Sequence, residues 1–408
     1  MLNIPRLKPS GNVICNARTG YNRVMRLLFV VDARSPIAMN WIRHFIERSD
    51  DEVYIASTFA SNLDVSIKRL EVIPVAFSSV KKPSQRPGTA SSRTLGLRTK
   101  IRQWFGPLTV RRAAPRLRAF IEEVKPDLIH AMRIPYEGML AADAYKGVPL
   151  IVSIWGNDFT LHGPSTPLMR HYTRWSMVVA DALHADCHRD VRLAREWGLG
   201  TDRPSLVAPG NGGIRTDVFY PPKKSVEEPV ILNPRGIRQY VRNDSFFKAI
   251  PLVLQKQPNA KFMCTSMAGE SQAIQWTKEL KIGHAVELLS PIPNAEMANV
   301  YRHAQILVSP SIHDGTPNTL LEGMACGCFP TAGDLESIRE WITPNENGLL
   351  FDSTNPQSIA DAIIHAIENK SLRSIAAGLN QEIIATRADY GNNMQKVEDF
   401  YKLVIGKR

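Results

Sequence analysis

The sequence predicts two doubly wound α/β domains, each a parallel sheet covered by helices on both faces. Short apolar runs of strand length alternate with amphipathic segments of helix length along the whole chain. Strands that are apolar throughout are typical of parallel sheets buried on both faces. The alternation stops once, in a stretch rich in proline and charge at residues 218–228, and then restarts. We therefore expect two domains joined by this linker, and 408 residues are enough for both.

The first domain is expected over residues 25–217. Its strands are predicted at residues 25–33, 51–57, 69–75, 127–132, 147–158 and 181–187, and its helices at 37–48, 114–125 and 189–198. A glycine-containing segment, 204–214, closes this half. Residues 1–24 lack the apolar core of a secretory signal, and we expect them to form an extension without regular structure.

The second domain is expected over residues 229–385. Its strands are predicted at residues 229–236, 260–266, 285–292, 305–311, 328–333 and 347–352, and its helices at 244–257, 272–283, 294–304, 335–342 and 355–369, with one more starting near residue 317. Residues 386–408 are expected to form a C-terminal helix.

The positive charge of the chain is concentrated in one stretch. The formal net charge is +11, and the segment from Lys81 to Arg118 holds eleven basic residues and no acidic one. Such a patch favours phosphate groups on nucleic acid, an anionic membrane or a substrate. The odd number of cysteines, five, indicates a reducing, cytosolic compartment.

Aromatic side chains interrupt this basic stretch in a way that is typical of an interfacial helix. The residues that we assign to a membrane-binding patch are Lys81, Lys82, Arg98, Lys100, Arg102, Trp104, Phe105, Arg111 and Arg112. The alternative is a solvated, flexible loop. No run is long and apolar enough for a membrane-spanning helix, so the prediction is peripheral binding.

The segment "HDGTPNTLLEGMACGC" (His313–Cys328) combines a turn and a helix start between two acids. Thr316 is a suitable N-cap, Pro317 a suitable first helical residue and Gly327 a suitable C′ residue. The free amides of such a helix start favour an anion, and Gly315 permits close backbone approach. The segment follows a predicted parallel strand, where α/β sheets bind ligands.

The two acids of this segment cannot form one catalytic pair. Asp314 lies outside the turn, whereas Glu322 lies about one and a half turns into the helix. They are expected to hold two parts of one extended ligand with an anion between them, as in a nucleotide-diphosphate sugar. Arg235 and Arg242, near the first strand of this domain, are expected to supply countercharge to the diphosphate; surface ion pairing is the alternative.

The stretch "SPSIHDGTPNTLLEGMACG" resembles the signature of glycosyltransferase family 4, whose members are retaining enzymes with the GT-B fold of two Rossmann-like domains and a cleft between them. The segments "PGNGGIRTDVFYPP", "PRG" and "NGLLFD" agree with that pattern in order. The resemblance implies a C-terminal helix that crosses back to the first domain. It also implies that Asp314 binds the transferred sugar, where the family usually has Glu, and that Glu322 binds the ribose of the donor.

The resemblance also assigns roles to other residues near the two domains' strand ends. Gly315, Thr316, Pro317, Asn318 and Thr319 would meet sugar and phosphate, and Arg235 and Arg242 would bind the diphosphate. The acceptor side would include Asp158 and Asn157 in "WGND", together with His130 and Ser35. Three of these four also have a structural alternative: a helix cap for Asp158, a core histidine for His130 and turn chemistry for Ser35.

The sequence is therefore expected to encode a retaining hexosyltransferase that uses a nucleotide-diphosphate sugar and no metal ion or other cofactor. The resemblance implies a glycan or lipid-linked acceptor of cell-surface glycan biosynthesis, at the inner face of the cytoplasmic membrane. The alternatives are an epimerase or phosphorylase on the same fold, and a nucleic-acid-binding protein that uses residues 81–118. The complete nucleotide-sugar motif argues against nucleic acid as the partner.

Overall fold

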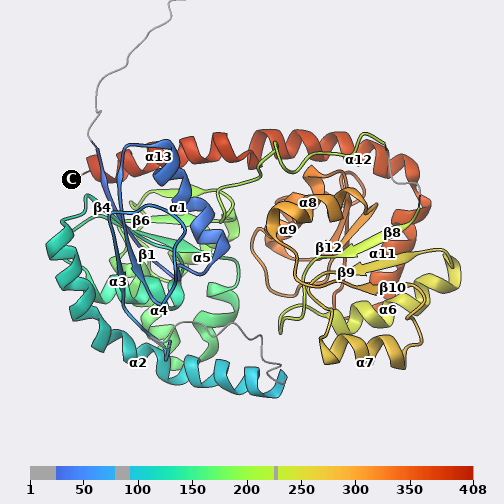
Figure 1. Cartoon of the computed structure of the whole chain (residues 1–408), viewed down its shortest axis with the longest axis horizontal. Helices are drawn as coiled ribbons and strands as arrows, with labels where there is room; N and C mark the ends of the chain where they lie inside the picture. The colour runs from blue at the N-terminus through green and yellow to red at the C-terminus, as the bar shows by residue number, and fades with distance from the viewer. Residues whose placement is uncertain (1–23, 79–91, 225–227, 408) are drawn as a thin grey trace, which may run out of the picture.

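The computed structural model describes residues 24–78, 92–224 and 228–407, and these form two α/β domains that lie side by side (Figure 1). Residues 1–23, most of the expected N-terminal extension, lie outside the described residues. Strands with continuous apolar sequence form the centre of each domain, as expected from the sequence. Helices cover both faces of each sheet, which agrees with the predicted fold class.

The first domain contains a seven-stranded sheet in the order β3-β2-β1-β4-β5-β6-β7, and all its strand pairs are parallel. The strands are β1 (Arg26–Val31), β2 (Glu52–Ser57), β3 (Arg69–Val72), β4 (Leu128–Ala131), β5 (Leu150–Ile154), β6 (Ala182–Ala185) and β7 (Ser205–Val207). The central strands β4, β5 and β6 are buried along their whole length. Their carboxyl ends point to one edge, where the cleft begins.

Helices and short helical turns surround this sheet. They are α1 (Pro36–Arg48), α2 (Ser92–Val124), η1 (Ile134–Gly138), α3 (Met139–Ala144), η2 (Asp158–His162), η3 (Gly163–Ser165), α4 (Pro167–Val179) and α5 (His188–Glu196). The sequence did not predict α3 or α4. It placed a helix at residues 114–125 and interpreted the preceding basic stretch as either an interfacial helix or a flexible loop; both belong to the one long helix α2, which accommodates Pro107 and Pro115.

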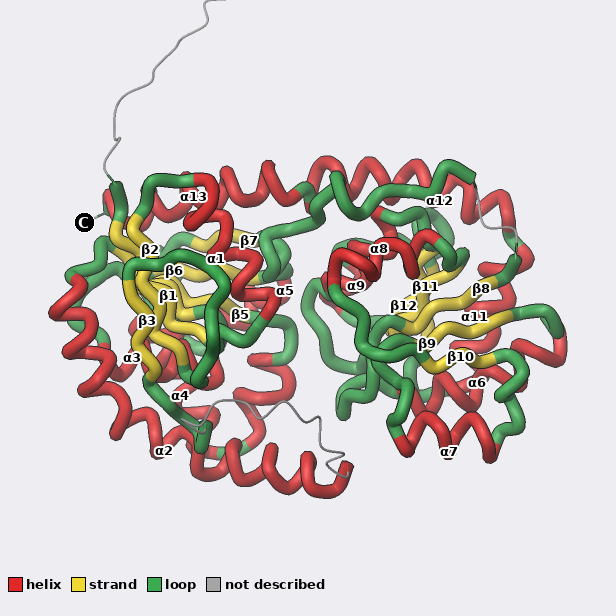
Figure 2. Tube along the Cα trace, in the orientation of Figure 1, coloured by secondary structure: helices red, strands yellow, loops and turns green. Residues whose placement is uncertain are grey.

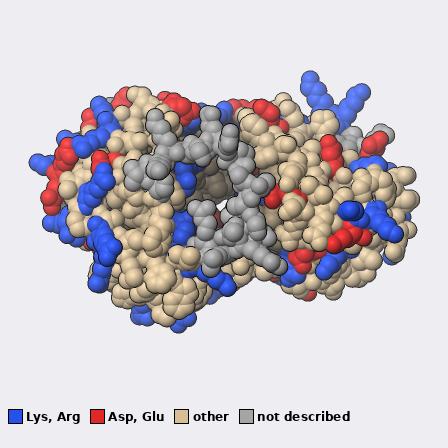
Figure 3. Space-filling model, turned by 60° about the horizontal axis from the view of Figure 1, so that its bottom comes forward, with Lys and Arg blue, Asp and Glu red and all other residues tan. Residues whose placement is uncertain are grey.

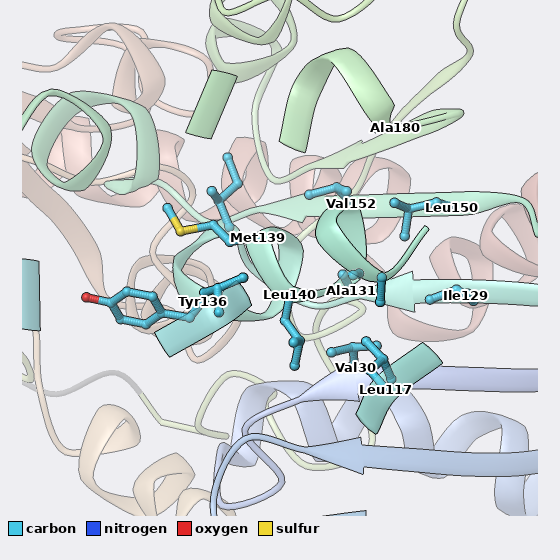
Figure 4. Packing of buried hydrophobic residues seen from close by; sticks show 14 of the residues in the cluster. Val30, Leu117, Ile129, Ala131, Tyr136, Met139, Leu140, Leu150, Val152 and Ala180 are labelled. Carbon is cyan, nitrogen blue, oxygen red and sulfur yellow. The ribbon is translucent and has the colours of Figure 1, made fainter. Parts of the chain in front are cut away.

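The core on one face of this sheet joins strand residues to helix residues. Figure 4 shows Val30, Ile129 and Val152 of the sheet beside Leu117 of α2 and Leu140 of α3. All five side chains are buried. Burial of this apolar area, at roughly 25 cal/mol per Å², is the main contribution that holds α2 and α3 against the sheet.

The second domain contains a six-stranded sheet in the order β10-β9-β8-β11-β12-β13, again with parallel pairing throughout. Its strands are β8 (Val230–Asn233), β9 (Lys261–Cys264), β10 (Val286–Leu288), β11 (Ile306–Ser309), β12 (Phe329–Gly333) and β13 (Leu349–Phe351). Its helices are α6 (Asn243–Lys256), α7 (Ser271–Glu279), α8 (Asn294–Arg302), α9 (Asn318–Ala325), α10 (Glu336–Arg339), α11 (Pro356–Glu368) and α12 (Lys370–Ile383).

The C-terminal part of the chain returns to the first domain. After α12 and the turn η4 (Ile384–Ala388), helix α13 (Tyr390–Gly406) packs on the first sheet, and Figure 2 shows this run along both domains. Met394 and Tyr401 of α13 lie in one buried cluster with Phe29 of β1 and Trp41 of α1. The last helix therefore completes the hydrophobic core of the first domain.

Two further features of the described residues concern their cysteines and the apolar character of their helices. Their four cysteines (Cys187, Cys264, Cys326 and Cys328) are buried and not in disulfides. In the same residues, none of the helices combines the length and the apolar character that crossing a lipid bilayer requires.

Candidate functional site

A cavity lies between the two domains, where the carboxyl ends of both sheets face each other. It has a volume of about 290 Å³. The residues that line it are Ser35, Ile37, Arg133, Trp155, Gly156, Asn157, Asp186 and Gly210 from the first domain, and Arg235, Arg238, Tyr240, Asp314, Thr316, Pro317, Asn318 and Thr319 from the second. Ligands of open α/β sheets bind at such strand ends. Six of the predicted donor-site residues thus share one cavity with Ser35 and Asn157 of the first domain: Arg235, Asp314, Thr316, Pro317, Asn318 and Thr319.

Gly315 brings the second domain into direct contact with the first. A Cβ atom at this position would lie 2.3 Å from Oδ1 of Asp186 and 2.6 Å from the Cα of Gly156. No side chain fits in that space, so the glycine allows the close approach of two domains. The sequence had predicted the close approach of a ligand at this position.

Helix α9 begins one residue later than predicted, with Pro317 as its N-cap. Thr316 does not cap the helix because its hydroxyl is used elsewhere: it donates to the carbonyl of Asp186 and accepts from Nε1 of Trp341 at 2.9 Å. The end of α9 agrees with the sequence. Gly327 has φ +85°, and its amide donates to the carbonyl of Met324 at 3.1 Å, as in a glycine-terminated helix.

Asp314 and Arg235 form an ion pair inside the cavity, with 2.6 Å between Oδ2 and Nη2. Nη1 of Arg235 also donates to the hydroxyl of Thr319 on α9 at 3.1 Å. The arginine side chain is only 10% exposed, and its Nε is buried without a partner. The structure therefore joins the predicted sugar-binding acid to the predicted diphosphate-binding arginine at the start of α9.

Glu322 is buried behind the cavity wall, on the same helix. Its two carboxylate oxygens accept from Nδ2 of Asn294 and from the hydroxyl of Tyr301, both at 2.9 Å. Burial raises the pKa of Glu322 to about 7, although both hydrogen bonds act in the opposite direction. With this pKa, the carboxyl group of Glu322 can gain or lose its charge near neutral pH.

Arg242 does not line the cavity in this structure, contrary to the expectation from the sequence. Its guanidinium forms two hydrogen bonds of 2.8 Å with Asp244 at the start of α6. The cavity wall instead carries Arg238, whose Nε donates to the carbonyl of Arg235 at 3.2 Å and whose side chain is exposed. Arg242 and Asp244 are two positions apart and form a local ion pair. This pair explains why Arg242 does not line the cavity.

Asp158 is fully buried and holds other groups of the first domain rather than facing the cavity. Its carboxylate accepts from Nε of Arg133 at 3.1 Å, and from the amides of Trp155 at 3.1 Å and Ile134 at 3.4 Å. Asn157 lines the cavity and accepts from Nη2 of Arg133 at 3.2 Å. The sequence reasoning missed Arg133, since a single arginine after a strand carries no motif.

His130 lies in the core of the first domain and not on the cavity wall. Nε2 of His184 donates to the carbonyl of Ala208 at 3.0 Å, so its Nδ1 accepts from the hydroxyl of Ser153 at 2.8 Å. The Ser153 hydroxyl then accepts from Nε2 of His130 at 2.7 Å, and Nδ1 of His130 accepts from the hydroxyl of Tyr401. Every donor in this chain meets an acceptor when both rings are neutral, as their lowered pKa values indicate, and the chain ties α13 to the sheet.

Ser35 combines the two roles considered for it. Its side chain accepts from the amide of Ala38 at 3.4 Å as the N-cap of α1, and the residue also lines the cavity. A cap at the end of β1 therefore also contributes to the cavity wall.

Two charged residues connect the domains behind the cavity. Nη1 of Arg189 donates to the carbonyl of Asp314 at 2.7 Å, and Nη2 donates to the carbonyl of Gly156 at 2.7 Å. Glu340 of the second domain accepts from the amides of His188 and Arg189, at 2.8 and 2.9 Å, and so caps helix α5 of the first. The sequence contains no local signal for the contacts of Arg189 with Asp314 or of Glu340 with α5, because these partners lie more than a hundred positions apart.

A buried acidic group lies beside this connection. Ligand atoms of Asp186, Cys187 and Asp190 lie within 4.8 Å of one another. Arg189 forms an ion pair of 2.8 Å with Asp190, and burial raises the pKa of the Asp186 carboxyl. The guanidinium of Arg189 supplies the positive charge beside this buried acidic group.

The membrane-binding patch that the sequence predicted is only partly described. Lys81 and Lys82 lie outside the described residues, and for Arg98 only the helical backbone is described. The remaining members, Lys100, Arg102, Trp104, Phe105, Arg111 and Arg112, all belong to α2. Trp104 and Phe105 are 52% and 54% exposed. Figure 3 shows that Lys and Arg side chains are spread over the surface of the first domain.

Comparison with known families gives two matches that together cover most of both domains. Residues 215–378 match the family described as "Glycosyl transferases group 1". Residues 60–210 match "Glycosyl transferase 4-like domain". The two matches meet close to the expected linker at residues 218–228.

Curated relatives are similar over part of their length. The chain is 22% identical over 200 residues to the "D-inositol 3-phosphate glycosyltransferase" of Corynebacterium diphtheriae, covering 44% of this chain and 46% of that protein. It is 24% identical over 220 residues to the protein of the same name from Thermobispora bispora, covering 49% and 51%. The chain thus spans about half the length of the curated relatives that it matches.

Solved structures share the fold over almost the whole chain. The sucrose-phosphate synthase of Thermosynechococcus elongatus superposes with a TM-score of 0.70 at 13% identity, covering 94% of this chain and 100% of that chain. Anabaena Alr3699/HepE in complex with UDP-glucose gives a TM-score of 0.70 at 14% identity, covering 93% and 99%. At such low identity these structures establish the two-domain architecture.

Proposed function

Since the chain belongs to the family 4 glycosyltransferases with the GT-B fold, we propose that it transfers a sugar from a nucleotide-diphosphate donor to an acceptor hydroxyl with retention of configuration. The observation that carries this proposal is the cluster of Arg235, Asp314 and Thr319 at the start of α9, with Glu322 buried on the same helix. Anabaena HepE is a structural neighbour in complex with UDP-glucose, so UDP is the first nucleotide to test.

In the proposed reaction, the donor diphosphate binds between Arg235 and the free amides of α9. The bond between the sugar C1 and the phosphate oxygen breaks, and the acceptor hydroxyl forms a new bond to C1 from the same face. A donor phosphate oxygen takes the proton of the hydroxyl. The leaving diphosphate develops negative charge as this bond breaks. The positive charge that the protein already holds at that place is the main stabilising effect. This countercharge comes from the protein itself, so the proposal requires no metal ion.

Asp314 and Glu322 act on different parts of the donor in this proposal. The Asp314 carboxylate leaves Arg235 and accepts from hydroxyls of the transferred sugar, while the diphosphate takes over the guanidinium. Glu322 accepts from the ribose hydroxyls, because carboxylate oxygens can accept more than the two hydrogen bonds that Asn294 and Tyr301 donate.

A donor-binding experiment tests this proposal. Glu322→Gln, with Glu296→Gln on the exposed surface of α8 as the matched control, is titrated calorimetrically with UDP, GDP and their sugars. We expect the control to bind one nucleotide normally and Glu322→Gln to bind it at least about tenfold more weakly. Unchanged affinity of Glu322→Gln for every nucleotide would contradict the assignment. Epimer formation without acceptor, or turnover that requires free phosphate, would favour an epimerase or phosphorylase.

We further propose that the acceptor is a lipid-linked or polysaccharide intermediate of cell-surface glycan synthesis, reached at the inner face of the cytoplasmic membrane. Ile101, Trp104, Phe105 and Leu108 are 43–54% exposed and follow the i, i+3, i+4, i+7 spacing of one helix face. Lys100, Arg111 and Arg112 are exposed on the same helix. Aromatic and basic side chains on one helix are suited to an anionic lipid surface.

Vesicle binding tests the membrane proposal. The wild type should sediment with anionic vesicles and not with neutral ones, and Trp104→Ser with Phe105→Ser should abolish sedimentation. The matched control is Trp175→Ser, an exposed tryptophan on α4. Equal sedimentation with both kinds of vesicle, or loss of binding only in the control, would contradict the proposal.

A further inference from the structure

A second cavity lies where the chain crosses from the second domain back to the first, and we call it the crossover cavity. It has a volume of about 180 Å³. His188 of α5 and Lys396 of α13 line it from the side of the first domain, and Glu340, Trp341 and Arg387 line it from the second. None of these five residues lines the donor cavity. The proposed sugar transfer therefore gives this cavity no role.

The crossover cavity is formed beside the two segments that connect the domains. The amide of Ile214, just before the linker, donates to the carbonyl of Ala388 at 2.7 Å, and the amide of Tyr390 donates to the carbonyl of Ile214 at 3.0 Å. Figure 1 shows α12 and α13 running along both domains on this side of the molecule. A ligand in the crossover cavity thus contacts both domains where they are joined.

Three basic side chains on the cavity wall have no hydrogen-bonding partner in the part of the chain that the structure describes. They are His188, Arg387 and Lys396, and all three are exposed. Arg387 stacks on a ring, with its guanidinium carbon 4.4 Å from the ring centre of Trp341. By contrast, Arg215 beside the linker is paired with Asp217 at 2.9 Å. The positive charge at the crossover cavity is therefore free to meet a ligand.

The two acidic residues of the same wall do not cancel this charge. The carboxylate of Glu340 accepts from the amides of His188 and Arg189, at 2.8 and 2.9 Å, and so serves the start of α5. Asp186 is buried, and burial raises the pKa of its carboxyl well above the ordinary value. The remaining charge of the cavity wall is positive, which suits an anion.

A hydrogen-bonded connection leads from the crossover cavity to the donor cavity. Trp341 is 6% exposed, and its Nε1 donates to the hydroxyl of Thr316 at 2.9 Å. Thr316 lines the donor cavity and directly precedes Pro317, the N-cap of α9. The ring that stacks on Arg387 is thus held to the loop that carries Asp314.

We propose that the crossover cavity is a second binding site, for a small molecule with a phosphate group, and that its occupation strengthens donor binding. A guanidinium fork and an ammonium group together match phosphate oxygens in geometry and charge. The volume corresponds to roughly six water molecules at about 30 Å³ each, enough for a phosphate with a small organic group.

The effect on the donor follows from the position of the site between the domains. Residues of both domains form the donor cavity, so a ligand that bridges the domains favours the arrangement that the donor requires. The two ligands must then strengthen each other's binding by the same factor. This effect rests on the proposed function, whereas the anion site itself does not.

Inorganic phosphate is the first probe, titrated calorimetrically into the full-length protein saturated with UDP. UDP occupies the donor diphosphate site, so the measured phosphate binds elsewhere. We expect Arg387→Gln and Lys396→Gln to bind phosphate at least about tenfold more weakly than the wild type. Lys402→Gln, an exposed lysine further along α13, and Arg170→Gln, an exposed arginine on α4, are the matched controls and should bind as the wild type does.

UDP titrations with and without phosphate measure the effect on the donor. Phosphate competes with UDP at the donor site equally in all variants, so the difference between variants reports the crossover cavity. With phosphate present, the wild type should bind UDP at least about fivefold more tightly than Arg387→Gln does, and without phosphate the two should agree within about twofold. Trp341→Phe keeps the ring beneath Arg387 but lacks Nε1; it should bind phosphate normally and lose the effect on UDP.

Two results would overturn the proposal. One is the absence of phosphate binding by the UDP-saturated wild type, and the other is binding of wild-type strength by both Arg387→Gln and Lys396→Gln. Both substitutions are at exposed positions, and circular dichroism verifies that the variants are folded. If no nucleotide diphosphate binds at all, the proposed transferase function fails, and phosphate binding that depends on Arg387 would still support the anion site.

Glycerol 3-phosphate, compared with inorganic phosphate and with glycerol, identifies the source of the phosphate group. Binding of glycerol 3-phosphate at least about tenfold tighter than that of phosphate indicates a phosphorylated metabolite, and equal binding indicates the free ion. In both cases the affinity should fall in Arg387→Gln and in Lys396→Gln. Affinities that do not depend on either residue contradict the proposal.

Discussion

Nη2 of Arg235 lies 2.6 Å from Oδ2 of Asp314, so the two groups assigned to the diphosphate and to the sugar neutralise each other. The pair is largely shielded from water, with side-chain exposures of 10% and 15%. This ion pair has to break before a diphosphate can bind the guanidinium of Arg235. The ion pair is therefore a competitor of the donor, and this leads to the first prediction.

Asp314→Asn should bind free UDP about three- to tenfold more tightly than the wild type, because Arg235 is released from its carboxylate. The same variant should lose most sugar transfer, since the contact to the transferred sugar is weakened. Calorimetry measures the first effect and donor turnover the second. Asp334→Asn, which breaks an exposed pair with Arg339 in the same domain, is the control. Weaker UDP binding by Asp314→Asn would show that the carboxylate assists the diphosphate site.

Donor affinity should rise with pH around neutrality because of Glu322. Burial raises the pKa of this carboxyl to about 7 from an ordinary value of 4.5. Below that pH the folded protein holds it neutral, and in the proposed donor site only the charged form would accept from both ribose hydroxyls. UDP affinity should therefore increase by up to about tenfold per pH unit as the pH rises towards 7, and level off above it.

The dissociation constant of UDP, measured between pH 5.5 and 8.5, checks this pH dependence. Glu322→Gln should bind weakly and without a step near pH 7. A wild-type profile that is flat, or that falls with rising pH, is incompatible with a ribose-binding Glu322.

Stability should fall in mild acid because of the buried histidines. Burial lowers the pKa of His184 from its ordinary value of 6.5 to about 4, and burial also lowers the pKa of His130 well below 6.5. Between these values the unfolded state binds a proton that the folded state excludes. The free energy of unfolding should thus decrease, as pH falls from 6.5 towards 4, by about 1.4 kcal/mol per pH unit for each ring.

Urea unfolding between pH 4.5 and 7 measures this slope. His184→Gln keeps a donor for Ala208 and an acceptor for Ser153 but does not titrate, so its slope should be smaller by the contribution of one ring. His284→Gln, at an exposed position, should keep the wild-type slope. Equal slopes for His184→Gln and the wild type would mean that His184 is charged in the fold.

Glu340 should favour the arrangement of the two domains in this structure, here called closed, over a more open one. Its carboxylate accepts from the amides of His188 and Arg189 across the domain boundary, in the manner of an N-cap. Loss of a cap costs about 1 kcal/mol, which would shift a closed-to-open equilibrium about fivefold. Glu340→Ala should therefore show a larger radius of gyration in X-ray scattering.

The control for this variant is Glu196→Ala, which removes an exposed pair with Arg192 at the far end of α5. It should scatter as the wild type does. An unchanged radius for Glu340→Ala, with and without UDP, would show that the contact does not govern closure.

Local patterns in the sequence predicted much of the fold. Continuous apolar runs marked the strands of both sheets, because strands of a buried parallel sheet have no polar face. The end of α9 was predicted from Gly327, whose left-handed conformation needs only its immediate neighbours. The prediction separated a helix at residues 114–125 from the basic stretch before it, whereas both form the one helix α2, because its packing on the sheet outweighs its local propensity at Pro107 and Pro115.

The sequence by itself determined the two parallel sheets, the linker region and the presence of two acids around a helix start, since these depend on residues only a few positions apart. Only the tertiary structure decided which groups meet. It pairs Arg235 with Asp314, 79 positions away, directs the Thr316 hydroxyl to Asp186 and holds Arg133 on Asp158. Such contacts depend on how two finished domains and their strand ends approach each other, and no periodicity along the chain records that approach.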